Sequence, residues 1–198
     1  MAGPRQQFDF SLAMRVLCAD ICRRELAFQH IRMDHVAVSF AQTRRRVLHG
    51  LQAKLTPLRF ENGNMTTWRG RTEWTIRRMF HDETEVLYIL TFYLPRFFEQ
   101  PFREKLITVF HELYHISPHF NGDIRRFEGR YHVHSHSHHE YDREMGRMAD
   151  EYIARRAPAK YWSFLQYDFQ ELVARHGQVV GLRIPIPRMI RLPEKRSA

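Results

Sequence analysis

Residues 110–116 read Phe-His-Glu-Leu-Tyr-His-Ile, and this stretch decides how the rest of the chain is interpreted. His111 and His115 are four residues apart, so on an α-helix their imidazoles lie about 40° apart around the axis and can face one ion. Glu112 is offset by about 100°, which puts its carboxylate beside such an ion rather than on it. Neutral imidazole suits Zn²⁺, and a neighbouring carboxylate can take a proton from water. The pattern predicts a zinc-binding helix with Glu112 as general base.

The sequence on either side of this motif predicts a buried helix that follows a buried strand. Pro101 is typical of a first helical turn, and Pro118 disfavours helix beyond Ile116. Apolar residues between these prolines recur on one face. Before the helix, Val86 to Leu94 is apolar on both faces, which is typical of a central strand.

Further elements are predicted on both sides of this unit. An amphipathic helix is expected over residues 8–29, capped by Ser11, because apolar residues recur there at helical spacing. Strands are expected at residues 36–40, at 55–60 as an edge strand around Pro57, and at 66–80. Two later helices are expected over roughly residues 140–155 and 160–175, the second closing at Gly177, followed by an extended tail from Val179.

This order of elements predicts an α+β fold in one domain spanning residues 1–198. A small mixed sheet of three or four strands is expected to pack on the helix that carries the motif. The core is expected over about residues 34–155, with the helix 8–29 before it. A C-terminal helix and an extended arm are expected over residues 156–198.

Composition excludes several classes of protein. The chain has 198 residues, of which 43% are hydrophobic, so it can form a packed core. Two cysteines exclude a disulfide framework and a Cys-rich zinc ribbon. The longest uncharged apolar run, Val86 to Leu94, is too short to span a bilayer, and the N-terminal residues do not resemble a signal peptide. We therefore expect a soluble, cytoplasmic protein without membrane contact.

The net charge of +9 predicts some attraction to polyanions. The arginines form small clusters at Arg44–Arg46, Arg77–Arg78, Arg125–Arg126 and Arg155–Arg156. Because these clusters are dispersed, a solvated basic surface is favoured over a specific nucleic-acid site. The chain also has 13 histidines, and these are concentrated near the motif.

The motif leaves the third protein ligand of a catalytic zinc ion open. His119 is eight residues after His111, but Pro118 interrupts the helix between them. A carboxylate from the next helix would be a thermolysin-like solution, with Glu140, Glu144 and Glu151 as candidates. A pool of histidines follows the motif, of which one or two at most are expected to bind the ion: His132, His134, His136, His138 and His139. The metzincin pattern requires a histidine at position 121, where this chain has Asn121, and this difference excludes that subclass.

Residues 105–142 resemble a family of small metallopeptidases of bacteria, phages and archaea, which are minimal zincins. The resemblance rests on the motif helix, the turn Pro118-His-Phe-Asn-Gly122 and the Arg-rich segment 125–130, and it extends over about residues 34–155. It implies a zincin-like fold with His111 and His115 as zinc ligands and Glu112 as base. The family's downstream histidine maps best to His134, with His136 as the runner-up.

The resulting hypothesis is a zinc-dependent metallopeptidase that hydrolyses peptide bonds in a peptide or protein substrate. A tetrahedral oxyanion would need a donor besides zinc. Four residues are candidates: Tyr131, Tyr141, His132 and Arg126. One alternative is a DNA-associated metalloprotein similar to SprT-like proteases, which would use the basic clusters. Another is a non-catalytic zincin fold in which a metal only fastens the helix to the following loop.

Overall fold

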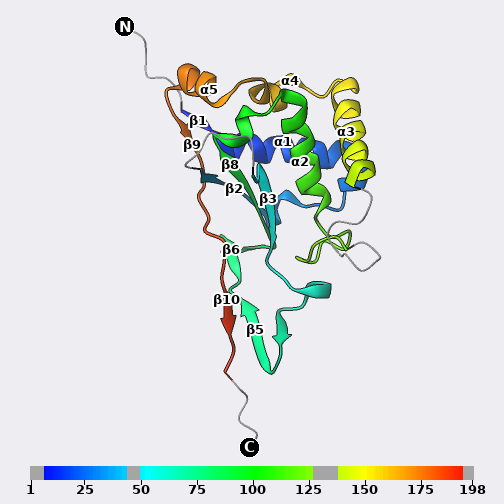
Figure 1. The fold of residues 1–198 in the computed structure, drawn as a ribbon, viewed down its shortest axis with the longest axis vertical. Coiled ribbons are helices and arrows are strands. Elements are labelled where there is room, and N and C mark those ends of the chain that lie inside the picture. Colours follow the sequence, from blue (N-terminus) through cyan, green and yellow to red (C-terminus); the bar gives the residue numbers. More distant parts are fainter. Residues whose placement is uncertain (1–6, 44–49, 127–137, 194–198) are drawn as a thin grey trace, which may run out of the picture.

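The computed structural model describes residues 7–43, 50–126 and 138–193, with only the backbone for residues 138–142. Its architecture is α+β, as predicted: helices gather around a small sheet at one end, and a slender β-structure extends from the other end (Figure 1). None of the described helices is both long and apolar enough to cross a membrane.

The central sheet has three strands in the order β2-β8-β3, with bounds β2 (Val36–Gln42), β3 (Ala53–Pro57) and β8 (Tyr88–Leu94). β8 runs parallel to β2 and antiparallel to β3, so the sheet is mixed, as predicted. Six of the seven residues of β8 are buried, because both faces of this strand are covered. β3 lies at the edge, which agrees with the presence of Pro57.

Helix α1 (Phe10–Arg24) presents its apolar stripe to the core, and Phe10, Met14, Leu17 and Ile21 are fully buried. The helix is shorter than the predicted 8–29, because Phe8–Asp9 forms strand β1 and Glu25 is extended. The predicted cap was also wrong. The Asp9 carboxylate accepts the Leu12 N–H at 2.9 Å, whereas the buried Ser11 hydroxyl accepts the N–H of Leu182.

Helix α2 (Phe102–Tyr114) carries the motif and packs against α3 (His138–Ala154), which was predicted within a few residues. Pro101 occupies the cap position just before α2. The predicted single helix over 160–175 is instead three pieces: α4 (Ala159–Trp162), the 3₁₀ turn η5 (Ser163–Gln166) and α5 (Phe169–His176). Asp168 starts α5 with a capping box, which interrupts the earlier helix, and Gly177 closes α5 with a φ of 75°.

Lys105 explains why the helix is interrupted before α5. Its side chain is buried in α2, and its ammonium donates to the carbonyl of Leu165 at 3.0 Å and to that of Tyr167 at 2.7 Å. These carbonyls are therefore held by a tertiary contact instead of by a continuous helix.

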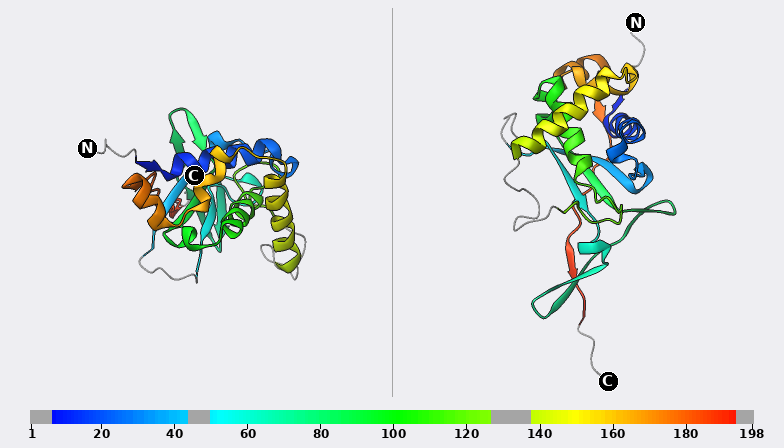
Figure 2. Two further views of the ribbon diagram at one scale, coloured as in Figure 1. Left: turned by 90° about the horizontal axis from the view of Figure 1, so that it is seen from above. Right: turned by 90° about the vertical axis from the view of Figure 1, so that its right-hand side faces the viewer.

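The single strand predicted over 66–80 was wrong, because this range contains one hairpin and the first strand of a second. β4 (Thr66–Arg69) and β5 (Thr72–Ile76) are joined through Gly70, which has a φ of 60°. β6 (Met79–His81) pairs with β7 (Thr84–Val86). A third strand, β10 (Met189–Arg191), pairs with β5, and we call β4, β5 and β10 the β finger (Figure 2, right).

The predicted extended arm is present after α5. It begins with β9 (Val179–Val180), which pairs with β1 (Phe8–Asp9) in parallel, and it ends in β10. Between these strands the Leu182 carbonyl accepts the N–H of Phe40 in β2. Four further 3₁₀ turns complete the described elements: η1 (Leu26–Phe28), η2 (Met33–His35), η3 (Glu61–Gly63) and η4 (Arg96–Glu99).

Candidate metal centre

Packing of α2 brings the two motif histidines to one face of the helix. Phe110 and Leu113 are fully buried in the core, and Phe110 contacts the rings of Phe28 and Tyr152. With these residues turned inward, His111 and His115 lie half-buried at the border of the core. Their ring centroids are 4.6 Å apart, so the structure brings the two imidazoles together as the spacing predicts.

Glu112 points toward the edge of the sheet. Its side chain is buried, and its Oε2 atom accepts the backbone N–H of Leu55 in β3 at 2.6 Å. Among the described residues, Oε1 has no hydrogen-bond partner. Burial raises the pKa of Glu112 to about 7, although the Leu55 N–H and the charge of Lys54 act in the opposite direction. A carboxyl group with this pKa can both take up and release a proton near neutral pH.

A hollow of about 600 Å³ lies between β3 and α2, and both His111 and Glu112 line it. Its strand side includes Gln52 and Ala53, and its helical side includes Arg103. This volume is within the range of small-ligand sites, so the hollow offers room for a substrate next to the motif. The sequence did not indicate these wall residues. The edge-strand prediction at Pro57 was the one available signal for an accessible sheet edge beside the helix.

The segment after α2 folds back on the end of the helix. Arg125 donates its backbone N–H to the His115 carbonyl at 2.7 Å, and Ser117 donates to the Asp123 carbonyl at 3.2 Å. Arg125 also stacks over the ring of Tyr114, with its guanidinium carbon 4.0 Å from the centroid. The turn that resembles the zincin pattern therefore forms a bracket that holds the last turn of the motif helix.

Tyr88 of β8 fastens this bracket to the sheet. Its fully buried hydroxyl accepts the N–H of Gly122 and donates to the carbonyl of Asp123, both at 2.9 Å. Burial raises the pKa of Tyr88 to about 12, so the hydroxyl stays protonated. Gly122 has a φ of 86°, and a side chain there would meet Arg59. These contacts, which the sequence did not reveal, fix where the bracket lies.

Arg126, a candidate oxyanion donor, forms a bidentate ion pair with Asp123, with both distances at 3.0 Å. The Asp123 carboxylate is buried and also accepts the N–H of Asn62. In this position Arg126 stabilises the bracket, and its role toward an oxyanion stays a prediction. The other three candidates, Tyr131, His132 and the side chain of Tyr141, lie outside the described residues.

Within the side chains that the structure describes, no group of three or more His, Cys, Asp or Glu residues could hold a metal ion. His119 is exposed beyond the helix end. Glu144 bonds to Arg147, and Glu151 bonds to Arg147 and Arg155, so both candidate carboxylates are engaged on their own helix. The remaining candidates lie outside the described side chains: His132, His134, His136, His138, His139 and Glu140.

Comparison of the chain with protein-family models, with curated proteins and with solved structures gives no match in any of the three. The α+β architecture therefore stands on the structure itself. The resemblance to minimal zincins rests on the residues of the motif helix and the bracket.

Proposed function

We propose that this chain is a zinc-dependent metallopeptidase with a zincin-like fold. The observation that supports it most directly is the adjacency of three groups on α2: the imidazoles of His111 and His115, 4.6 Å apart, and the buried carboxylate of Glu112 beside them. His111 and Glu112 line a hollow at a sheet edge, where a peptide has room to bind.

The donor set fits zinc. Two imidazoles four residues apart on a helix are typical zinc ligands, and a catalytic site adds a third protein ligand while keeping one position open. We assign the third position to His134, with His136 as the runner-up. When bound, Zn²⁺ would supply a Lewis acid that acidifies water and polarises a carbonyl group.

In this proposal Glu112 handles the proton. The Leu55 N–H holds Oε2, which leaves Oε1 to accept a proton from the attacking water. As the C–N bond of the substrate breaks, the same carboxyl group delivers that proton to the leaving amine nitrogen. The buried position and the Leu55 N–H hold the carboxyl group in place for this exchange.

The edge of β3 supports an extended peptide as the substrate class. β3 has β8 on one side only, and on its other side the N–H of Leu55 is directed at Glu112. A peptide lying along this edge would pass the hollow with its backbone close to the motif.

Metal content tests the ligand assignment. Elemental analysis of tag-free protein should give about one zinc ion per chain. The ion should be lost in His111→Ala and in His115→Ala, and in one of His134→Ala and His136→Ala. His81→Ala is the matched control, because His81 is exposed on a distant hairpin. Zinc that is absent, or unaffected by the helix variants, would refute the site.

Glu112→Gln tests the mechanism separately from the metal. The Gln side chain keeps an oxygen that can accept the Leu55 N–H, so the fold and the zinc content should be retained. Hydrolysis of a quenched peptide library should fall by about a hundredfold or more, as expected for loss of a general base. Full activity in this variant would refute the role of Glu112. Zinc binding without hydrolysis by the parent would favour the non-catalytic alternative.

A further inference from the structure

The β finger extends beyond the body of the protein, and Ile76 at its base packs against a small core cluster of Leu58, Val86 and Ile89. In Figures 1 and 2 it extends from the body on the side away from α4 and α5. All five residues of β5 are only half-buried, and Trp68 in β4 is 65% exposed. A small sheet normally covers one face with other parts of the protein. The half-buried strand β5 and the exposed indole of Trp68 beside it therefore call for a functional explanation.

Arginines outnumber acidic residues on the finger and on the residues that flank it. Residues 65–78 and 187–193 contain one acidic residue, Glu73, and six arginines: Arg69, Arg71, Arg77, Arg78, Arg188 and Arg191. Arg69 and Arg71 flank Gly70 at the tip, and both are exposed. Within the part of the chain that the structure describes, neither forms an ion pair.

Arginines of the other clusters are paired, and so is Arg78 with Glu85 at the root of the finger. Arg126 is paired with Asp123, and Arg155 is paired with Glu25 and Glu151. Their charges are partly neutralised by neighbours, so they attract a distant polyanion less than unpaired arginines do. Arg44–Arg46 lie outside the described residues. Among the described residues, Arg69 and Arg71 therefore form an exposed basic pair at the finger tip that no ion pair neutralises.

Strand register places the ring of Trp68 one residue before Arg69, near the basic tip of the finger. Trp68 is opposite Glu73, and the next pair toward the tip is Arg69 with Thr72. Adjacent residues of a strand point to opposite faces, so Trp68 lies on one face and Arg69 on the other. Thr66, Glu73 and Thr75 share the face of Trp68, and the Thr75 hydroxyl donates to the Met65 carbonyl at 2.9 Å. This combination of an exposed ring, hydroxyl groups and nearby guanidinium groups matches the chemistry of a stacked base and its phosphates.

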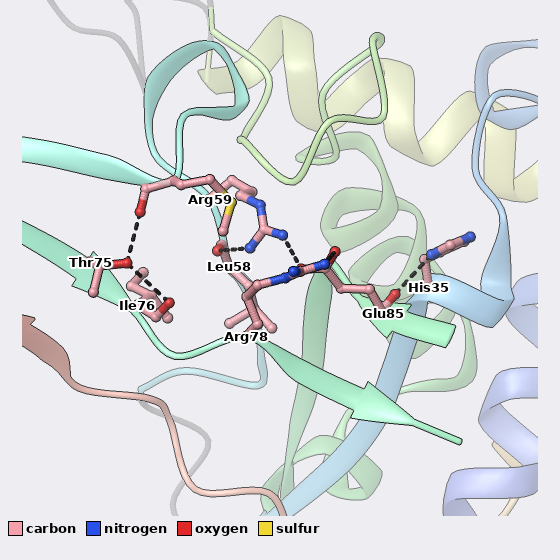
Figure 3. Close-up of polar contacts among 8 residues, drawn as sticks. His35, Leu58, Arg59, Thr75, Ile76, Arg78 and Glu85 are labelled. Atoms are coloured by element: carbon pink, nitrogen blue, oxygen red, sulfur yellow. Dashed lines mark hydrogen bonds and ion pairs between the residues drawn. The ribbon is translucent and has the colours of Figure 1, made fainter. Parts of the chain in front are cut away.

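The root of the finger is held firmly (Figure 3). Arg78, which follows β5, donates to both carboxylate oxygens of Glu85 at 3.0 and 2.8 Å. Glu85 is also paired with the buried Arg59, and its backbone carbonyl bonds to the ring of His35 at 2.8 Å. The arginines and the ring beyond this root are thus carried on an anchored scaffold.

We propose that the β finger binds single-stranded nucleic acid, with the base of one nucleotide stacked on Trp68 and phosphates held by Arg69 and Arg71. A single strand is favoured over a duplex because stacking on an exposed indole needs an unpaired base. A membrane surface fits less well, because Trp68 is flanked by Thr67 and Arg69 and not by a continuous apolar surface. The inference does not depend on the metal centre.

Fluorescence anisotropy with a labelled oligothymidylate of about 20 nucleotides tests the proposal on the full chain. Binding should weaken steeply with salt. The double variant Arg69→Ala/Arg71→Ala should bind about tenfold or more weakly and reduce the slope of log K against log salt by about 1.4. The control, Arg156→Ala/Lys160→Ala, removes the same charge from exposed positions near α4 and should bind like the parent.

Trp68→Ala should lower the affinity about five- to a hundredfold, whereas Trp68→Phe, which keeps a stacking ring, should restore most of it. Parallel titrations with oligouridylate, with a DNA duplex and with anionic vesicles identify the partner. Preference for either single strand over both other probes supports the proposal. Absence of binding at low salt, equal weakening by the control, tighter binding to duplex, or Trp68-dependent binding to vesicles would overturn it.

Discussion

Replacing Tyr88 by Phe removes one oxygen atom from the middle of the molecule and tests how the bracket is held. The hydroxyl is the only described partner of the Gly122 N–H, and it is one of two donors to the Asp123 carbonyl, which also accepts from Ser117. Phe keeps the ring, which packs on Phe120 at a centroid distance of 5.4 Å. The variant therefore isolates the hydrogen bonds.

The magnitude follows from these partners. Leaving the buried N–H of Gly122 unsatisfied costs about 1–3 kcal/mol, and the second bond contributes about 0.5–1.5 kcal/mol, since Asp123 keeps one donor. We therefore expect a loss of roughly 1.5–4.5 kcal/mol in the free energy of unfolding, or about 3–18 °C in Tm for a chain of this size.

Urea unfolding followed by circular dichroism measures this loss, provided that the transition is two-state. Tyr93→Phe in the same strand is the matched control, because its half-buried hydroxyl makes no hydrogen bond to a described residue. It should change the stability by less than about 0.5 kcal/mol. A Tyr88→Phe effect as small as that of the control would refute the bracket as a stabilising unit.

Three further outcomes are expected. Lys105→Met should reduce stability by about 2–4 kcal/mol, measured by urea unfolding, because two buried carbonyls lose their donor; an unchanged midpoint would contradict this. Cys18 and Cys22 should resist iodoacetamide at about pH 8 until the protein is denatured, because burial raises the pKa of both thiols, that of Cys22 to about 12. Rapid labelling of the native protein would contradict this prediction. Burial and the charge of Arg125 lower the pKa of His30 below its ordinary 6.5, so the unfolded state binds more protons than the folded state as the pH falls. The free energy of unfolding should therefore decrease below about pH 6.5, and this decrease should be weaker in His30→Gln. An identical pH profile of stability in the parent and the variant would contradict this prediction.

The parts of the fold that could be predicted are those whose pattern is strong over short distances. The apolar run of β8, the stripe of α1 and the motif helix were all recognisable, because burial dictates their residues directly. Two predictions failed where another interaction outweighed the pattern. Gly70 turned one expected strand into a hairpin, and the capping box at Asp168 divided one expected helix.

The candidate site, like the fold, has features that a local sequence pattern predicts and features that it does not. The pairing of His111 with His115 follows from helical spacing alone, and the structure confirms that the rings adjoin. The bond from Leu55 to Glu112 joins residues 57 positions apart, and that from Tyr88 to Gly122 joins residues 34 apart. Such contacts depend on how strands and loops meet in space, for which no local pattern exists. The third zinc ligand and the peptidase activity stay predictions.

The finger also constrains the order in which the protein assembles. β4 and β5 leave the ribosome together, but their third strand follows more than a hundred residues later, since Ile76 pairs with Met189. Until then β5 presents an unpaired edge on a two-stranded hairpin, which has little stability of its own and can pair with other chains. The body around α2 is translated earlier. A nascent chain therefore reaches the stage of a formed motif helix before the finger is complete, and crowding of nascent chains at this stage favours misassembly through β5.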